Sequence, residues 1–185
     1  MKFASLFTGI VAALATTAVA SPLTSFSKRD AAEVVDTVKS ISTQVIELET
    51  TVQSFTGQVI KALKIQIKTG KLTKTLEDAI EKTQESPNFT MDESVTIAMG
   101  FIDLQPKITK VLDALISKKD VFKKGLFGFI PLTGIVRGDL EKQKELSAQL
   151  GQETVKKLTP DFANLAPIIN DLIAADFARA VAAFS

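Results

Sequence analysis

The chain of 185 residues contains no cysteine and no histidine. Without cysteine it forms no disulfide, so hydrophobic burial must hold the fold together. Without either residue type, most thiol, triad and transition-metal mechanisms lose a group that they need. These absences favour a binding protein over an enzyme, and neither a metal site nor a cofactor is expected.

The charge of the chain is close to balanced, with 22 basic and 21 acidic residues. Removal of Lys2, Lys28 and Arg29 by processing would leave 19 basic residues against 21 acidic ones, a formal charge of −2. Such a balance gives no support to nucleic-acid binding or to strong electrostatic docking on anionic lipid.

The first 20 residues have the pattern of a signal peptide, with a charged start, an apolar stretch and small residues before a cleavage site at Ala20. The apolar stretch is shorter than the roughly 20 residues that cross a bilayer. We therefore expect a secreted protein whose mature form has no transmembrane segment.

Residues 21–29 then resemble a short pro-segment that ends at the dibasic pair Lys28-Arg29. The alternative is that this pair is simply exposed on the surface. With the pro-segment removed, residues 30–185 are long enough for a single domain with a substantial core.

A seven-residue apolar repeat follows the dibasic pair and marks one face of a long helix, predicted from Asp30 to Phe55. Its members alternate at steps of four and three residues: Val34, Val38, Ile41, Val45, Leu48, Val52, Phe55 and Val59.

Apolar spacing predicts four further helices. Residues 63–67 also alternate as in a strand, but no second run of that kind offers a partner. A capping box at Thr90 and Glu93 marks one helix start, and Pro160 marks another. The helices are expected over Val59–Glu85, Met91–Ser117, Ile135–Leu158 and from Pro160 nearly to the end. The fold class is therefore all-α, a five-helix bundle with mostly antiparallel neighbours.

The connector from Gly125 to Gly134 is unusually apolar for a loop. Because most apolar side chains of small domains are buried, closure of one end of the bundle is the favoured interpretation. The alternatives are a flexible apolar flap or a contact patch for waxy surfaces. We define the surface patch as Leu126, Phe127, Phe129 and Ile130.

Few other residues indicate a site of modification or catalysis. Asn88-Phe89-Thr90 is an N-glycosylation sequon in a proline-containing break between helices. The acidic pairs Glu77-Asp78 and Asp92-Glu93 are most simply solvated or capping residues, and nothing indicates two carboxylates facing each other across a cleft. No catalytic residue is predicted.

Several motifs in order resemble one known family. They are the apolar repeat that begins near Val34, the segments Leu104–Ile108 and Lys118–Phe122, and the closing stretch Ala175–Ser185. Together they are similar to the fungal hydrophobic surface-binding protein A and antigenic cell-wall galactomannoprotein family, over nearly all of the mature chain.

This resemblance implies a secreted helical bundle found in the medium or the cell wall. Some members enclose long-chain fatty acids between their helices, whereas others adsorb to hydrophobic solids and recruit a polyester-degrading hydrolase. The charged residues Asp176 and Arg179 make the C-terminal stretch unlike a lipid-anchor signal.

The inward apolar stripes supply the expected lining of a fatty-acid site, with Gln44 beside them as a polar contact for the headgroup. The alternative for Gln44 is that it flanks the core and faces water. The expected ligand-binding residues are Ile41, Gln44, Val45, Leu48, Val52, Leu63, Ile67, Leu76, Ile102, Leu112, Leu140, Ile169 and Leu172.

Overall fold

A computed structural model describes residues 23–185, with side chains from Ala31 onward. The expected signal peptide and its cleavage site at Ala20 lie outside the described residues. Within residues 23–185, no helix combines the length and apolar character required to cross a membrane.

The described chain is all-α, as predicted. Five long helices and two short ones follow one another: α1 (Leu23–Gln53), α2 (Val59–Glu85), α3 (Met91–Ser117), α4 (Lys119–Lys124), α5 (Thr133–Lys157), α6 (Pro160–Ala163) and α7 (Ala166–Ala183). The prediction of five helices did not include α4, and it joined α6 and α7 into one. Residues 63–67 lie within α2, so their alternation does not reflect a strand.

The first helix begins earlier than expected. It starts at Leu23 rather than Asp30, so the backbone of the dibasic pair Lys28-Arg29 is helical. The pro-segment remains a prediction.

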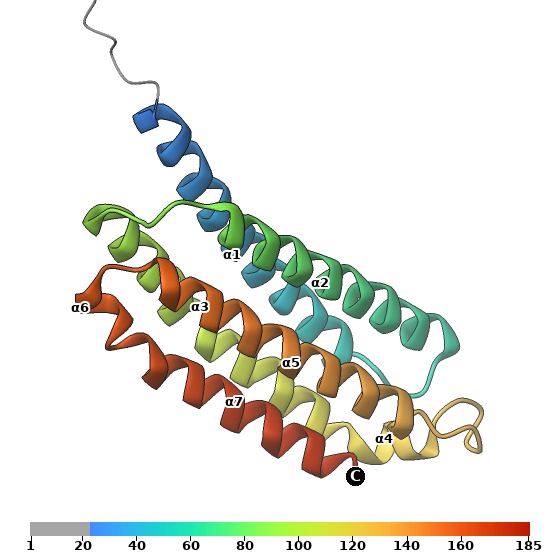
Figure 1. Cartoon of the computed structure of the whole chain (residues 1–185). Coiled ribbons are helices and arrows are strands. Elements are labelled where there is room, and N and C mark those ends of the chain that lie inside the picture. Colours follow the sequence, from blue (N-terminus) through green and yellow to red (C-terminus); the bar gives the residue numbers. More distant parts are fainter. Residues whose placement is uncertain (1–22) are drawn as a thin grey trace, which may run out of the picture.

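The five long helices form a closed ring. Going round it, α1 packs along α2, α2 along α5, α5 along α7, α7 along α3, and α3 along α1. In Figure 1, α1, α3 and α7 run from upper left to lower right, whereas α2 and α5 run the opposite way. Long helices consecutive in sequence are therefore antiparallel, as expected. The other three contacts of the ring, α2 with α5, α3 with α7 and α1 with α3, join parallel helices.

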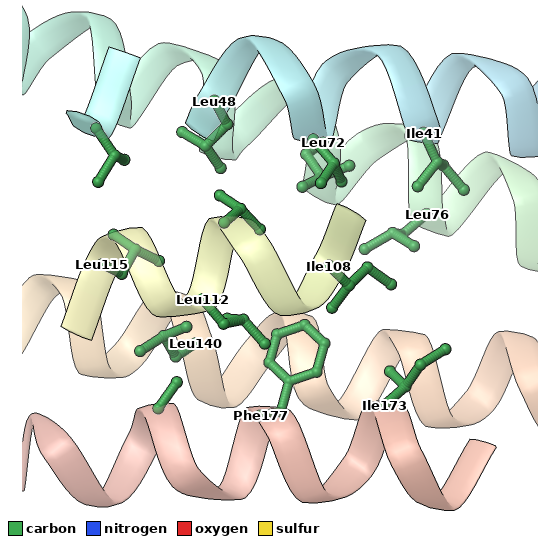
Figure 2. Close-up of a cluster of buried hydrophobic side chains, with 14 of the residues drawn as sticks. Ile41, Leu48, Leu72, Leu76, Ile108, Leu112, Leu115, Leu140, Ile173 and Phe177 are labelled. Atoms are coloured by element: carbon green, nitrogen blue, oxygen red, sulfur yellow. The ribbon is translucent and has the colours of Figure 1, made fainter. Parts of the chain in front are cut away.

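The interior of the ring is apolar because each long helix turns an aliphatic face toward it. The predicted repeat is at most 3% exposed at every position from Val34 to Phe55. Its expected last member, Val59, instead starts α2 and is 43% exposed. Figure 2 shows Ile41, Leu72, Leu112 and Phe177, from four different helices, pointing toward one another. Burial of these side chains, without any disulfide, is the source of stability.

One end of the ring is closed by three phenylalanines. The ring of Phe122, on α4, lies 4.8 Å from that of Phe55 and 5.9 Å from that of Phe184, measured between centroids. All three are buried. The expectation that the apolar connector closes this end was wrong: Phe127 and Phe129 are 71% and 75% exposed, and Ile130 is also exposed.

The connector is a loop closed by backbone hydrogen bonds. The backbone N–H groups of Leu126 and Ile130 each donate to the carbonyl oxygen of the other, at 2.9 and 3.1 Å. Gly125 adopts a positive φ of 61°, and a Cβ there would lie 1.6 Å from the carbonyl oxygen of Ile130. The loop therefore requires glycine at this position.

We expect Phe122→Ala to lower the free energy of unfolding by about 3–5 kcal/mol, because the substitution opens a cavity between Phe55 and Phe184. Urea denaturation followed by circular dichroism measures this change. Phe129→Ala is the control, with an expected change within about 0.5 kcal/mol because the side chain is exposed. Equal losses for the two variants would contradict the assignment of end closure to Phe122.

Candidate ligand-binding site

A small cavity of about 40 Å³ lies inside the ring. Aliphatic side chains from all five long helices line it, together with Phe101 and Phe177. No lysine, arginine, aspartate or glutamate is among its lining residues. The cavity therefore suits an uncharged apolar chain.

Three polar side chains line the central cavity, all from α5 and α7. They are Gln143 and Ser147, one helical turn apart on α5, and Asn170 on α7. The amide nitrogen of Gln143 donates to the carbonyl oxygen of Thr69, at 3.5 Å. Ser147 and Asn170 are thus the groups best placed to contact a polar headgroup.

A second pocket of about 130 Å³ opens between α3, α5, α6 and α7. It is also apolar, with Met99, Ile102, Phe162 and Leu165 among its lining residues. Phe101 and Asn170 line both this lateral pocket and the central cavity. These two side chains therefore stand between the two spaces.

Asn170 fits at this junction because α5 carries a glycine opposite it. A Cβ on Gly151 would lie 2.5–2.8 Å from three atoms of the Asn170 side chain. Gly151 itself is buried. The missing side chain leaves the room that the Asn170 amide occupies between α5 and α7.

Seven of the thirteen expected ligand-binding residues lie at these two spaces. Five line the central cavity (Ile41, Val45, Leu48, Leu76 and Leu112) and two line the lateral pocket (Ile102 and Ile169). Val52 and Leu140 are buried in the core without lining either space. Leu63, Ile67 and Leu172 do not face the interior, contrary to expectation: they are exposed on the outer sides of α2 and α7.

Gln44 is buried, but it does not reach the cavity. Its amide nitrogen donates to Ser40 Oγ at 3.0 Å and to Thr75 Oγ1 at 2.9 Å. Its polar contacts therefore tie α1 to α2, and neither expectation for this residue, a headgroup contact or a water-facing position, describes it.

The sequence interpretation missed Phe101, Ser147 and Asn170. Their spacing on the helices is compatible with the inner face, but a serine or an asparagine near a core stripe is not distinguishable from a surface residue until the neighbouring helix is placed. The buried Gly151 on α5 was the one available signal, because it marks a close approach.

The charged residues lie outside the ring and link its helices. Arg179 on α7 donates to Asp113 on α3 at 2.5 Å and to Asp176 at 2.9 Å, and these two carboxylates raise the pKa of its guanidinium. Burial raises the pKa of the Asp139 carboxyl. Among the described residues, no cluster of acidic side chains is arranged to hold a metal ion.

A third hollow, a groove between α1 and α3, is open to solvent. It contains Lys107, whose ammonium donates to Asp103 and, at 2.8 Å, to Ser42 Oγ. The groove measures about 580 Å³, and its lysine already has two partners.

The expected surface and modification sites are accessible. The rings of Phe127 and Phe129 stack at 6.2 Å on the exposed loop, with Leu126 partly buried beneath them. Asn88 is exposed between α2 and α3. Thr90 of the sequon caps α3 in the predicted capping box, in which its backbone N–H donates to Glu93 Oε2 at 2.8 Å.

Known proteins share this fold. The chain is 26% identical to cell wall mannoprotein 1 of Aspergillus fumigatus over 186 aligned residues, spanning all of this chain and 60% of that protein. The structure of Afmp4p in complex with palmitic acid superposes with a TM-score of 0.79 at 22% identity, covering 84% of this chain and 99% of the other.

Ligand-binding domain 1 of Penicillium marneffei MP1, complexed with arachidonic acids, superposes with a TM-score of 0.73 at 20% identity. The match covers 81% of this chain and 95% of that domain.

A family model matches residues 31–156, which include most of α1, all of α2, α3 and α4, and nearly all of α5. The chain belongs to the hydrophobic surface binding protein A family.

Proposed function

We propose that this protein is a secreted, non-enzymatic carrier that holds a long-chain fatty acid, or a similarly apolar ligand, along the axis of its helical ring. The observation that carries the proposal is the aliphatic cavity enclosed by five helices, with polar groups confined to α5 and α7. The complexes of Afmp4p with palmitic acid and of MP1 with arachidonic acids support it, because the same fold holds fatty acids there.

Binding along the axis requires the ring to open. Ligand pockets typically measure about 300–1,000 Å³, whereas the central cavity and the lateral pocket measure about 40 and 130 Å³. Displacement of Phe101 and Asn170 would join the two spaces into one channel. The lateral pocket is accordingly the route by which we expect the ligand to reach the axis.

The free energy of burial is large enough for this rearrangement. Fourteen methylenes contribute about 11 kcal/mol at roughly 0.8 kcal/mol each. Association and side-chain ordering cost several kcal/mol. The difference leaves room for micromolar or tighter affinity.

The headgroup site follows from the positions of the polar side chains. Asn170 lies at the junction of the two spaces, and Ser147 faces the cavity one turn from Gln143. An amide N–H and a hydroxyl both donate to a carboxylate. We therefore place the carboxylate at Asn170 and Ser147, with the tail along the aliphatic interior.

The proposed place of action is the cell wall or the extracellular medium. The signal-peptide pattern of residues 1–20 supports export, and the relative in Aspergillus fumigatus is a cell wall mannoprotein. The exposed Asn88 is the proposed glycosylation site.

Native mass spectrometry of the secreted protein should show a bound lipid of fatty-acid mass, which solvent extraction removes. The delipidated protein should then bind a fluorescent fatty acid, and added palmitate should displace this probe. Absence of both copurified lipid and fluorescent binding would rule out the carrier function.

Asn170→Leu should lower the affinity for palmitate at least tenfold, because a hydrogen bond to a charged group contributes about 1.5–3 kcal/mol. The affinity for hexadecanol should change less, since its headgroup is uncharged. Competition against the fluorescent fatty acid measures both affinities. Asn164→Leu, at the exposed end of α6, is the matched control; equal effects of the two substitutions would count against the headgroup site.

A second function, adhesion to hydrophobic solids, is favoured by the exposed surface patch. Phe127 and Phe129 project from a hydrogen-bonded loop, and the chain belongs to a family described by hydrophobic surface binding. A coat of this protein on a polyester would be a platform for recruiting a secreted hydrolase.

The double substitution Phe127→Ser and Phe129→Ser should reduce adsorption to polystyrene beads at least tenfold, because each buried phenylalanine contributes about 1.5–3 kcal/mol. Binding of the fluorescent fatty acid should not change. The control pair is Ile168→Ser and Leu172→Ser, which removes exposed apolar side chains from α7. Unchanged adsorption of the phenylalanine variant would show that the surface patch does not mediate adhesion to hydrophobic solids.

A further inference from the structure

Positive charge is concentrated at one end of the ring, although the whole chain is nearly neutral. Between Glu49 and Glu77 the sequence contains five lysines and no acidic residue. Between Asp120 and Asp139 it contains Lys123, Lys124 and Arg137, again without an acidic residue, although Arg137 pairs with Glu141 at 2.8 Å.

The fold brings these two segments together. A Cβ on Gly57, just before α2, would lie 3.5 Å from the carbonyl oxygen of Gly125. Figure 1 shows the start of α2 and the loop before α5 side by side at the same end of the molecule. We call this region, residues 57–74 together with residues 123–137, the basic end.

An apolar stripe runs along the outer side of α2 within the basic end. Ile60, Leu63 and Ile67 are 69%, 59% and 63% exposed. The inner side of the same helix is occupied by Ile65 and Leu72, which are buried. The stripe is therefore not part of the core.

Lysines lie on the same side of α2 as the stripe. At 100° per residue, Ile60, Leu63, Ile67, Lys64, Lys71 and Lys74 fall within an arc of about 100°. These three lysines are exposed, and none makes an ion pair with another described side chain. Lys68, by contrast, points toward α1 and pairs with Glu47 at 2.6 Å.

The surface patch extends the same pattern beyond α2. Phe127 and Phe129 are the most exposed large apolar side chains of the described residues, and Lys123 and Lys124 just before them are also exposed. The stripe and the surface patch therefore supply exposed apolar side chains with lysines beside them. Binding at a bilayer interface gains from both buried apolar area and the attraction of lysines to anionic lipid.

We propose that the basic end docks onto the surface of a bilayer that contains anionic lipid. Ile60, Leu63, Ile67 and the surface patch enter the interfacial layer, while Lys64, Lys71, Lys74, Lys123 and Lys124 contact lipid phosphates and carboxylates. The total charge of the chain is near neutral despite this basic surface. The acidic residues of α2 lie in its second half, at Glu77, Asp78, Glu81 and Glu85. The docking does not depend on a ligand inside the ring.

Cosedimentation of the purified secreted protein with vesicles tests the docking. The protein should bind vesicles made from two parts phosphatidylcholine and one part phosphatidylserine, and it should bind pure phosphatidylcholine vesicles much less. Raising the salt from about 0.1 M to about 1 M shortens the Debye length from about 10 Å to about 3 Å and should release most of the protein.

Two sets of substitutions separate the contribution of the lysines to vesicle binding from that of the apolar stripe. Lys64→Gln, Lys71→Gln and Lys74→Gln together should lower binding about 100-fold, since each lysine near an anionic surface contributes about fivefold. Ile60→Ser, Leu63→Ser and Ile67→Ser should also lower it at least tenfold. The controls for charge are Lys110→Gln and Lys144→Gln, which also remove exposed lysines that make no ion pair with a described side chain. The controls for apolar surface are Ile168→Ser and Leu172→Ser.

Three results would overturn the proposal: no preference for anionic vesicles, equal loss in the lysine variant and its control, or loss with the lysines but not with the apolar stripe. The last result would indicate a site for soluble polyanions instead of a bilayer. Circular dichroism of every variant shows whether the fold is intact, and fluorescent fatty-acid binding reports on the carrier function separately.

Discussion

The geometry of a five-membered ring is the constraint on which the rest of this structure depends. Helices that pack at interaxial distances of about 8–10 Å place their axes roughly 7–8.5 Å from the centre of a regular five-membered ring, farther than in a four-helix bundle. Side chains from all five helices must therefore extend to the middle to fill it. The long rows of valine, leucine and isoleucine on α1, α2, α3 and α5, with Ile173 and Phe177 on α7, meet that requirement and leave only a small cavity.

The same geometry bears on the proposed binding of an apolar ligand along the axis of the ring. Empty volume costs about 24 cal/mol per Å³, so a rigid channel of ligand size would cost much of the stability of a small domain. Side chains that fill the axis in the unliganded protein, and move aside when a ligand binds, would avoid this cost. Phe101 and Asn170 occupy the boundary between the two existing spaces, and the absence of cysteine means that no disulfide limits their movement or that of the helices.

The sequence predicted the parts of the fold that depend on periodicity. Seven of the eight residues of the predicted repeat, from Val34 to Phe55, are buried because α2 and α3 cover α1 on both sides of its apolar face. The eighth, Val59, lies in α2 and is exposed. The same reasoning failed for Leu63 and Ile67, because α2 carries apolar residues on two sides and only the ring decides which side faces inward. It also failed at the end of the ring, where Phe122 lies between lysines and looks like part of a polar connector, and at Gln44, whose partner Thr75 is 31 residues away.

The last helix completes the enclosure, because α7 fills the space between α3 and α5 and packs along both. Among the described residues α7 is the last long helix along the chain, so the ring stays open on one side until α7 docks. Under the proposed carrier function, an apolar ligand present at that stage would be enclosed as α7 packs against α3 and α5. The ligand found in the folded protein would then depend on which lipids the chain met while it folded.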